Sequence, residues 1–180
     1  MHKIFIIAAL LCYFNSPGQS KLKFKTINQF GVALGASQNA TQFNSINGVG
    51  YKTFSAGIGV GFDSYYFKTV PVFLDLRKNI FNREHTPFVY ADAGYNFPKG
   101  IEYVTQWEKS TYSGGVYYDL GIGYQIPLAG KLALNMSVGY SQKNLDETKE
   151  YSLWGMPNET RMEYYNYTFR RATIKLALSF

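Results

Sequence analysis

The fold that this sequence predicts is decided by the stretch EYYNYTFRRATIKLALSF, residues 163–180. In its second half, an apolar set alternates with a polar or small set. The apolar set is Ala172, Ile174, Leu176, Leu178 and Phe180, and the other set is Arg171, Thr173, Lys175, Ala177 and Ser179. A period of two places the two sets on opposite faces of a β-strand. The apolar face runs for about the 9–11 residues that carry a tilted strand across a bilayer, so the stretch predicts a transmembrane β-strand.

The same alternation recurs along the chain and predicts the other strands. Clear patterns cover residues 27–36, 54–62, 70–80, 87–97, 115–126 and 131–142. Thr41 to Gly48 has no clearly apolar face, but bacterial barrels have an even number of strands, and this segment completes the set. The short connections at 48–53, 81–86 and 127–130 then lie at the periplasmic end, and those at 63–69, 98–114 and 143–162 lie outside as loops. We expect an all-β fold, an antiparallel up-and-down transmembrane β-barrel of about eight strands.

Composition agrees with one exported membrane domain. A chain of 180 residues has room for one domain. The excess of Tyr, 16 residues against 2 Trp, favours an environment that is apolar on one side and aqueous on the other, such as a membrane interface. The mean hydropathy is −0.18, and outside the N-terminal segment no run approaches 18 apolar residues, which excludes transmembrane helices. The formal charge of +6 is scattered rather than gathered into a stripe, so no nucleic-acid partner is expected.

The N-terminus has the pattern of a secretory signal peptide. A short positive segment, Met1 to Lys3, precedes the apolar run Ile4 to Phe14 and a polar, turn-forming end. We expect residues 1–19 to be cleaved and residues 20–180 to form a single barrel domain. Cys12 lies inside the apolar run and is the one cysteine of the chain, so the mature protein has neither disulfide nor thiolate chemistry.

The inward faces predict a filled, charged interior. Barrels of about eight strands are closed by their own side chains, and glycines such as those at Gly57, Gly59 and Gly61 make room for large ones. Three acids face three bases on the inward faces, and buried charges need partners, so we expect ion pairs that hold the barrel closed. These residues are Asp75, Asp92, Asp119, Arg77, Arg171 and Lys175. A narrow path for ions or small solutes is the alternative.

No catalytic constellation is visible. His85, the single histidine after residue 19, falls in the connection 81–86, and neither a G-x-S-x-G motif nor metal-ligand spacing is present. We therefore predict no enzyme activity and no cofactor. The outer loops instead carry aromatic residues typical of contact surfaces, or of an aromatic girdle that needs no ligand. The candidate contact residues for an extracellular ligand are Tyr103, Trp107, Tyr112, Tyr151 and Trp154.

The chain resembles the small porin-like outer-membrane β-barrel family with OmpA/OmpX-type architecture. The resemblance is carried by Phe180 and by the runs GIGVGF (57–62), PFVYADAGY (87–95) and KLALNMSVGY (131–140). It implies a monomer surrounded by outer-membrane lipid in a Gram-negative bacterium, with Phe180 in the signal read by the barrel-assembly machinery. We expect a structural or surface-interaction role. The alternatives are a narrow porin and a soluble, lipocalin-like barrel with its apolar face turned inward around a ligand.

Overall fold

The computed structural model describes residues 22–35, 38–64, 68–99, 102–105, 108–152 and 160–180. The predicted signal peptide, residues 1–19, lies outside this part. Nine strands occur in it: β1 (Lys23–Leu34), β2 (Ala40–Tyr51), β3 (Phe54–Ser64), β4 (Lys68–Asn79), β5 (Thr86–Pro98), β6 (Glu102–Val104), β7 (Glu108–Ala129), β8 (Leu132–Ser152) and β9 (Thr160–Ser179). Nowhere in these residues is there a helix with the length and apolarity to cross a membrane.

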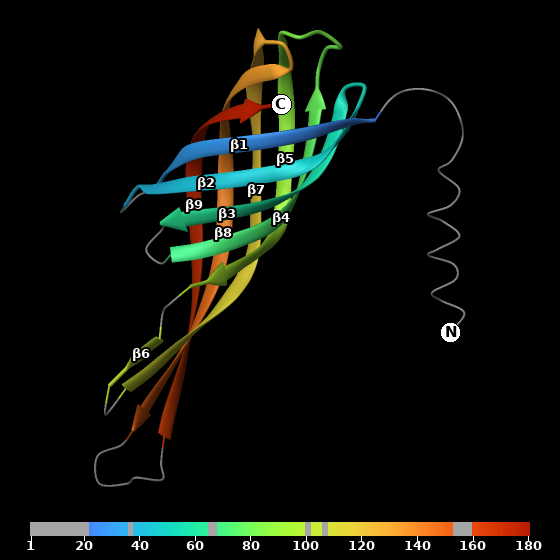
Figure 1. Cartoon of the computed structure of the whole chain (residues 1–180). Coiled ribbons are helices and arrows are strands. Elements are labelled where there is room, and N and C mark those ends of the chain that lie inside the picture. Colours follow the sequence, from blue (N-terminus) through green and yellow to red (C-terminus); the bar gives the residue numbers. More distant parts are fainter. Residues whose placement is uncertain (1–21, 36–37, 65–67, 100–101, 106–107, 153–159) are drawn as a thin grey trace, which may run out of the picture.

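Eight of the strands form a closed antiparallel ring (Figure 1). β1 to β5 pair one after another, and β9 joins β1 to β8. β7 pairs with β8 and closes the circle through its pairing with β5. β6 lies outside the ring and pairs with β7 alone. The prediction of an eight-stranded up-and-down barrel is confirmed, and it includes the weakly patterned second strand.

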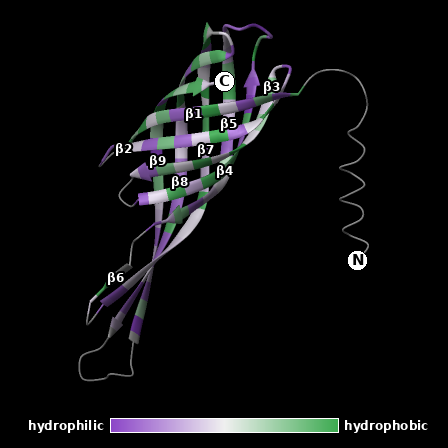
Figure 2. Cartoon of the chain, in the orientation of Figure 1, coloured by the Kyte–Doolittle hydropathy of each residue, from purple (hydrophilic) through white to green (hydrophobic). Residues whose placement is uncertain are grey.

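The two faces of each strand separate as the alternation predicts. Phe30, Ile58 and Leu176 are 55%, 62% and 52% exposed on the outer wall, whereas Lys175, beside Leu176, is 2% exposed inside. Figure 2 shows hydrophobic residues alternating with hydrophilic ones along the barrel strands. An apolar outer wall around a polar interior is the arrangement that a bilayer stabilises. It contradicts the lipocalin-like alternative, which required the apolar face to point inward.

Glycines make room inside the barrel for aromatic side chains of the neighbouring strand. Gly59 of β3 is paired directly with Phe73 of β4, and a Cβ atom at Gly59 would overlap the Phe73 ring. The same relation links Gly123 of β7 to Phe88 of β5. A narrow barrel can thus hold large rings because the position opposite each ring carries no side chain.

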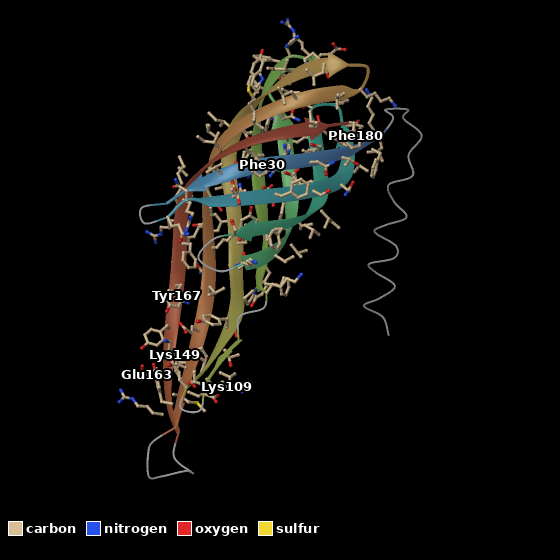
Figure 3. The ribbon with its side chains drawn as sticks, turned by 60° about the vertical axis from the view of Figure 1, so that its left-hand side comes forward. Phe30, Lys109, Lys149, Glu163, Tyr167 and Phe180 are labelled. Atoms are coloured by element: carbon tan, nitrogen blue, oxygen red, sulfur yellow. The ribbon has the colours of Figure 1, made fainter. Side chains whose placement is uncertain are left out.

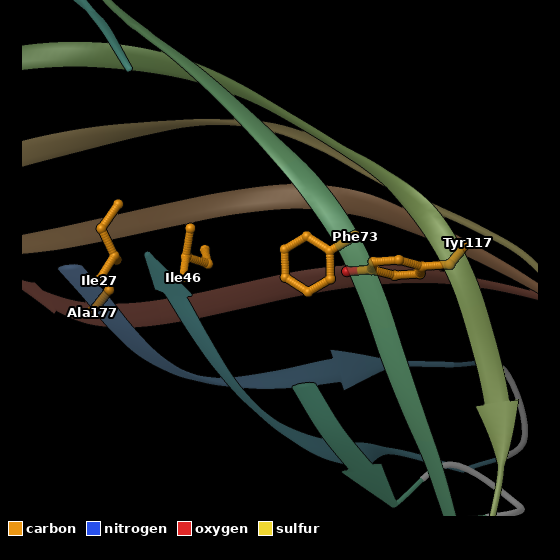
Figure 4. Packing of buried hydrophobic residues seen from close by; sticks show 5 residues of the cluster. All are labelled: Ile27, Ile46, Phe73, Tyr117 and Ala177. Atoms are coloured by element: carbon orange, nitrogen blue, oxygen red, sulfur yellow. The ribbon is translucent and has the colours of Figure 1, made fainter. Parts of the chain in front are cut away.

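A small apolar cluster lies among the polar interior residues (Figure 4). Phe73 and Tyr117 meet edge to face with ring centroids 5.4 Å apart. This geometry suits the quadrupoles of two aromatic rings. The other members of the cluster are Ile27, Ile46 and Ala177.

The segments predicted as long outer loops are largely β-structure, so that prediction is wrong. β7, β8 and β9 run for 22, 21 and 20 residues and extend together well beyond the ring (Figure 1). We call this extension the blade; it consists of β6 with residues 108–114, 145–152 and 160–169. Apolar alternation marks a strand only where one face meets lipid. In the blade, which extends beyond the ring, buried positions such as Ser110 and Glu147 are polar, so the hydropathy pattern ends while backbone pairing continues.

A β-bulge marks the junction between barrel and blade. The register of β7 against β8 shifts between Gly114, which pairs with Leu145, and Tyr117, which pairs with Lys143. A Cβ atom on Gly115 would press against the backbone of Asn144, so the bulge requires a residue without a side chain. Bulges increase strand twist, and the blade leaves the ring at this point.

Candidate functional site: the charged interior and the blade

The charged residues of the interior lie in three layers, the first near the end of the barrel with the short turns. Here the Arg77 guanidinium lies 2.8 Å from the Asp75 carboxylate, and both side chains are at most 5% exposed. Arg77 also donates through Nη2 to Gln29 Oε1 at 3.0 Å, and it stacks over the Phe88 and Tyr90 rings. Arg77 therefore ties β4 to β1 across the barrel.

The middle layer is organised by Lys175 of β9. Its Nζ lies 2.7 Å from Asp119 and 3.8 Å from Asp92, and all three side chains are at most 1% exposed. Asp75, Asp92 and Asp119 are direct cross-strand partners on β4, β5 and β7, an arrangement that repels unless cations intervene. Tyr90 contributes a further bond, donating its hydroxyl to Asp119 at 2.8 Å.

The third layer, next to the blade, contains residues that sequence reasoning missed. Lys143 pairs with Asp63, and Thr69 donates to the same carboxylate at 2.5 Å. Arg171 donates to the carbonyl of Gln38 at 2.6 Å. Asp63 and Lys143 had been assigned to outer connections. Extending the inward alternation of their strands by one step, from Gly61 and from Ser141, would have placed both inside.

These three layers bring all six predicted interior residues into the barrel, where salt bridges or hydrogen bonds connect each of them to the wall. A hollow beside Lys25 and Asp75 has a volume of about 10 Å³, enough for about one water molecule. A buried ion pair resists separation because either partner alone would be an uncompensated charge. The arrangement can fix the register of the ring.

The blade has its own polar centre at Glu147 of β8. Tyr112 and Tyr167 donate to its two carboxylate oxygens at 2.8 and 2.7 Å, and Lys149 lies 3.7 Å away. Burial works to raise the pKa of Glu147, but these hydrogen bonds and the Lys149 charge outweigh it and lower the pKa. Burial and the bond to Glu147 raise the pKa of Tyr112 to about 12.

Aromatic rings follow one another along the same face of β9. Tyr165 and Tyr167 stack with centroids 6.5 Å apart, and Tyr167 stacks on Phe169 at 6.3 Å. Tyr165 donates to Glu163 at 2.7 Å, and Lys149 lies over the Tyr165 ring. Figure 3 shows Tyr167, Lys149 and Glu163 on the blade, far from Phe180 on the barrel. The face is aromatic and bordered by charges.

The blade also has an open sheet edge along β9. β1 pairs with β9 only from Ser179 to Ala172, and in the described residues nothing pairs with 161–170 on that side. Thr26 and Phe180 exchange both backbone hydrogen bonds, so the even-numbered residues of β9 direct their N–H and C=O groups toward this edge. An open row of this kind is a template for another extended chain.

The predicted contact residues divide between described and undescribed parts of the chain. Tyr112 is half-buried in the blade through its bond to Glu147, and Tyr151 is half-buried on β8. Trp107, Trp154 and the side chain of Tyr103 lie outside the described residues. His85 is exposed in the turn 80–85, at the opposite end of the barrel from the blade. Within the described ranges, no group of His, Cys, Asp and Glu side chains is arranged to hold a metal ion.

Comparison with known proteins identifies the fold. OprG of Pseudomonas aeruginosa, an outer-membrane protein, superposes with a TM-score of 0.62 at 12% identity, over 89% of this chain and 97% of that one. Neisserial surface protein A gives 0.57 at 8% identity, over 87% and 94%. The N-terminal β-barrel domain of P. aeruginosa OprF gives 0.53 at 9% identity, over 89% and 100%.

Sequence comparison adds nothing to this likeness. No protein-family model matches the chain, and no curated protein matches it. The likeness at low identity concerns the backbone, and it agrees with the closed ring, the apolar wall and the polar interior found here. The chain therefore has the fold of a small outer-membrane β-barrel of the OmpA/OmpX type.

Proposed function

We propose that this protein is a non-catalytic barrel of the outer membrane of a Gram-negative bacterium that presents its blade outside the cell as a contact surface. The open edge of β9 is the observation that carries the proposal. Residues 161–170 span roughly 30 Å at about 3.3 Å per residue. An extended segment of an extracellular partner can add to this edge as a further strand.

Topology supports the orientation. The start of β1, the last residues of β9 and the turns 52–53, 80–85 and 130–131 lie at one end of the barrel, and the blade lies at the other (Figure 1). Outer-membrane barrels place short turns in the periplasm and long segments outside. In this orientation Phe180 is periplasmic, where the last strand would engage the barrel-assembly machinery. The ring has no free edge within the membrane, which supports a monomer.

The filled interior supports an anchor rather than a narrow porin. The ion pairs Lys143–Asp63 and Lys175–Asp119 and the hydrogen bond from Arg77 to Gln29 connect different strands inside the barrel at three levels. Bilayer conductance of the purified barrel tests this part of the proposal. We expect conductance equal to that of protein-free bilayers, and open channels would support the porin instead.

Proline substitution at the open edge tests the contact surface. Thr168 is exposed and even-numbered, so T168P removes an edge N–H while the bonds to β8 remain. T168A is the matched control, because it changes the side chain and keeps the N–H group. The folded protein in nanodiscs would be used to select binders from a phage-displayed library of 12-residue peptides.

We expect selected peptides to bind the wild type and T168A alike and to bind T168P at least tenfold more weakly. A boiling-dependent shift in gel mobility must be equal for the three proteins, which shows that each barrel is folded. Peptides that bind T168P as well as they bind the wild type would contradict edge addition.

A further inference from the structure

The rim with the short turns is strongly basic. Its exposed charged side chains are five bases and one acid: Lys23, Lys52, Lys78, Arg83, Lys131 and Glu84. In the proposed orientation this rim lies at the periplasmic leaflet. Clusters of lysine and arginine at a membrane surface attract anionic lipid headgroups.

An apolar groove lies on the outer wall just inside this rim. It has a volume of about 430 Å³, and its lining includes Leu22, Tyr51, Phe54, Ala56, Leu76 and Ala91. Ala56 of β3 pairs with Leu76 of β4, which pairs with Ala91 of β5, so small side chains flank a large one in the same row. Phe54 and Leu76 project outward, 56% and 59% exposed. The hollow forms because the small side chains of Ala56 and Ala91 lie next to the large side chains of Leu76 and Phe54.

Two lysines lie at the rim end of the groove. Lys78, itself part of the lining, holds its Nζ 4.8 Å from the Phe54 ring centroid. Lys52, in the turn after β2, holds its Nζ 5.3 Å from the Tyr51 ring centroid. Such side chains lay their methylene stems on apolar surface and keep the ammonium group at the water. The groove therefore has an apolar lining and two positive charges, those of Lys78 and Lys52, at its rim end, which we call the mouth.

We propose that this groove is a binding site for an anionic glycerophospholipid, with one acyl chain in the groove and the phosphate between Lys78 and Lys52. This inference rests on the proposed membrane location, because the groove opens on the lipid-facing wall. The volume of about 430 Å³ lies within the roughly 300–1,000 Å³ of ordinary ligand pockets, which leaves room for one acyl chain. The two ammonium groups select an anionic headgroup over a zwitterionic one.

Native mass spectrometry of the folded mature protein in detergent tests the site. The probes are phosphatidylglycerol and phosphatidylcholine with identical acyl chains. A56F and A91F would fill the groove, and A172F is the matched control, because Ala172 is exposed on the outer wall of β9 and does not line the groove. K52Q and K78Q remove the mouth charges, and K131Q is their control in the turn 130–131.

We expect the wild type, A172F and K131Q to retain one phosphatidylglycerol in preference to phosphatidylcholine. A56F and A91F should lose retention of both lipids. K52Q and K78Q should each lower the preference for phosphatidylglycerol about fivefold. Equal retention by the wild type and A56F, or no headgroup preference in the wild type, would overturn the proposal.

The boiling-dependent gel shift and insertion into vesicles separate this inference from the membrane location. A protein that inserts and shifts normally but retains no lipid contradicts the groove site alone. A protein that fails to insert into vesicles contradicts both.

Discussion

Replacing Lys175 with Met should destabilise the barrel more than any exposed substitution. Lys175 is the cation between Asp92 and Asp119, and all three side chains are buried. K175M keeps an unbranched side chain of nearly the same length and leaves two neighbouring carboxylates without this compensation. Removing one partner of a buried ion pair costs about 3–5 kcal/mol. This loss lowers the equilibrium constant for folding by about two to three and a half orders of magnitude.

Urea unfolding of the barrel in phospholipid vesicles measures this loss. K131M is the control, since Lys131 is exposed in a turn, and its free energy of unfolding should stay within about 0.5 kcal/mol of the wild type. D119N added to K175M removes one of the two uncompensated carboxylate charges and should recover part of the stability. If K175M unfolds at the same urea concentration as K131M, the interior ion pairs do not hold the barrel closed.

Three further predictions concern the blade, the ring and assembly. Because the pKa of Glu147 is lowered in the fold, the ionised carboxylate stabilises the blade at pH values above about 4.5, the ordinary pKa of a glutamate. Amide hydrogen exchange should show that the protection of the blade is lost as the pH falls through the lowered pKa. In E147Q this protection should not change over the same pH range. G59A should lower the free energy of unfolding by about 1–3 kcal/mol, because its methyl group meets the Phe73 ring, whereas G50A, with ordinary contacts, should not; equal unfolding would contradict the packing argument. F180A should slow assembly in cells, while refolding in detergent stays normal. The measurement is the amount of heat-modifiable protein in the outer membrane, which should fall. An equal delay in L178A would show that the loss of apolar area alone causes the effect.

The barrel could be predicted because the bilayer restricts which residues can occupy every second position of a spanning strand. Every second side chain of a spanning strand must be apolar, so Ile174 and Leu176 mark the lipid face and Thr173 and Lys175 the interior. Parity of strand number then placed β2, where the pattern was weak. Both inferences need only local alternation and one global rule.

The blade could not be predicted in this way, because its buried positions are not all apolar: Ser110 and Glu147 are buried polar residues. Tyr112, Glu147 and Tyr167 come from three strands, and only the long pairing of β7, β8 and β9 brings them together. Asp63 and Lys143 were misplaced for a related reason. Each lies directly after the end of a predicted strand, 54–62 for Asp63 and 131–142 for Lys143.

The sequence by itself determined the strand order, the apolar wall and the charged character of the interior, because these follow from a period of two and from the cost of exposing charge to lipid. Only the tertiary structure decided which charges pair, that the supposed loops form a sheet, and that its β9 edge and the groove at Ala56 are open. Those features depend on register and on contacts between strands distant in the chain. Neither the register nor these contacts produce a periodic pattern in the amino-acid sequence.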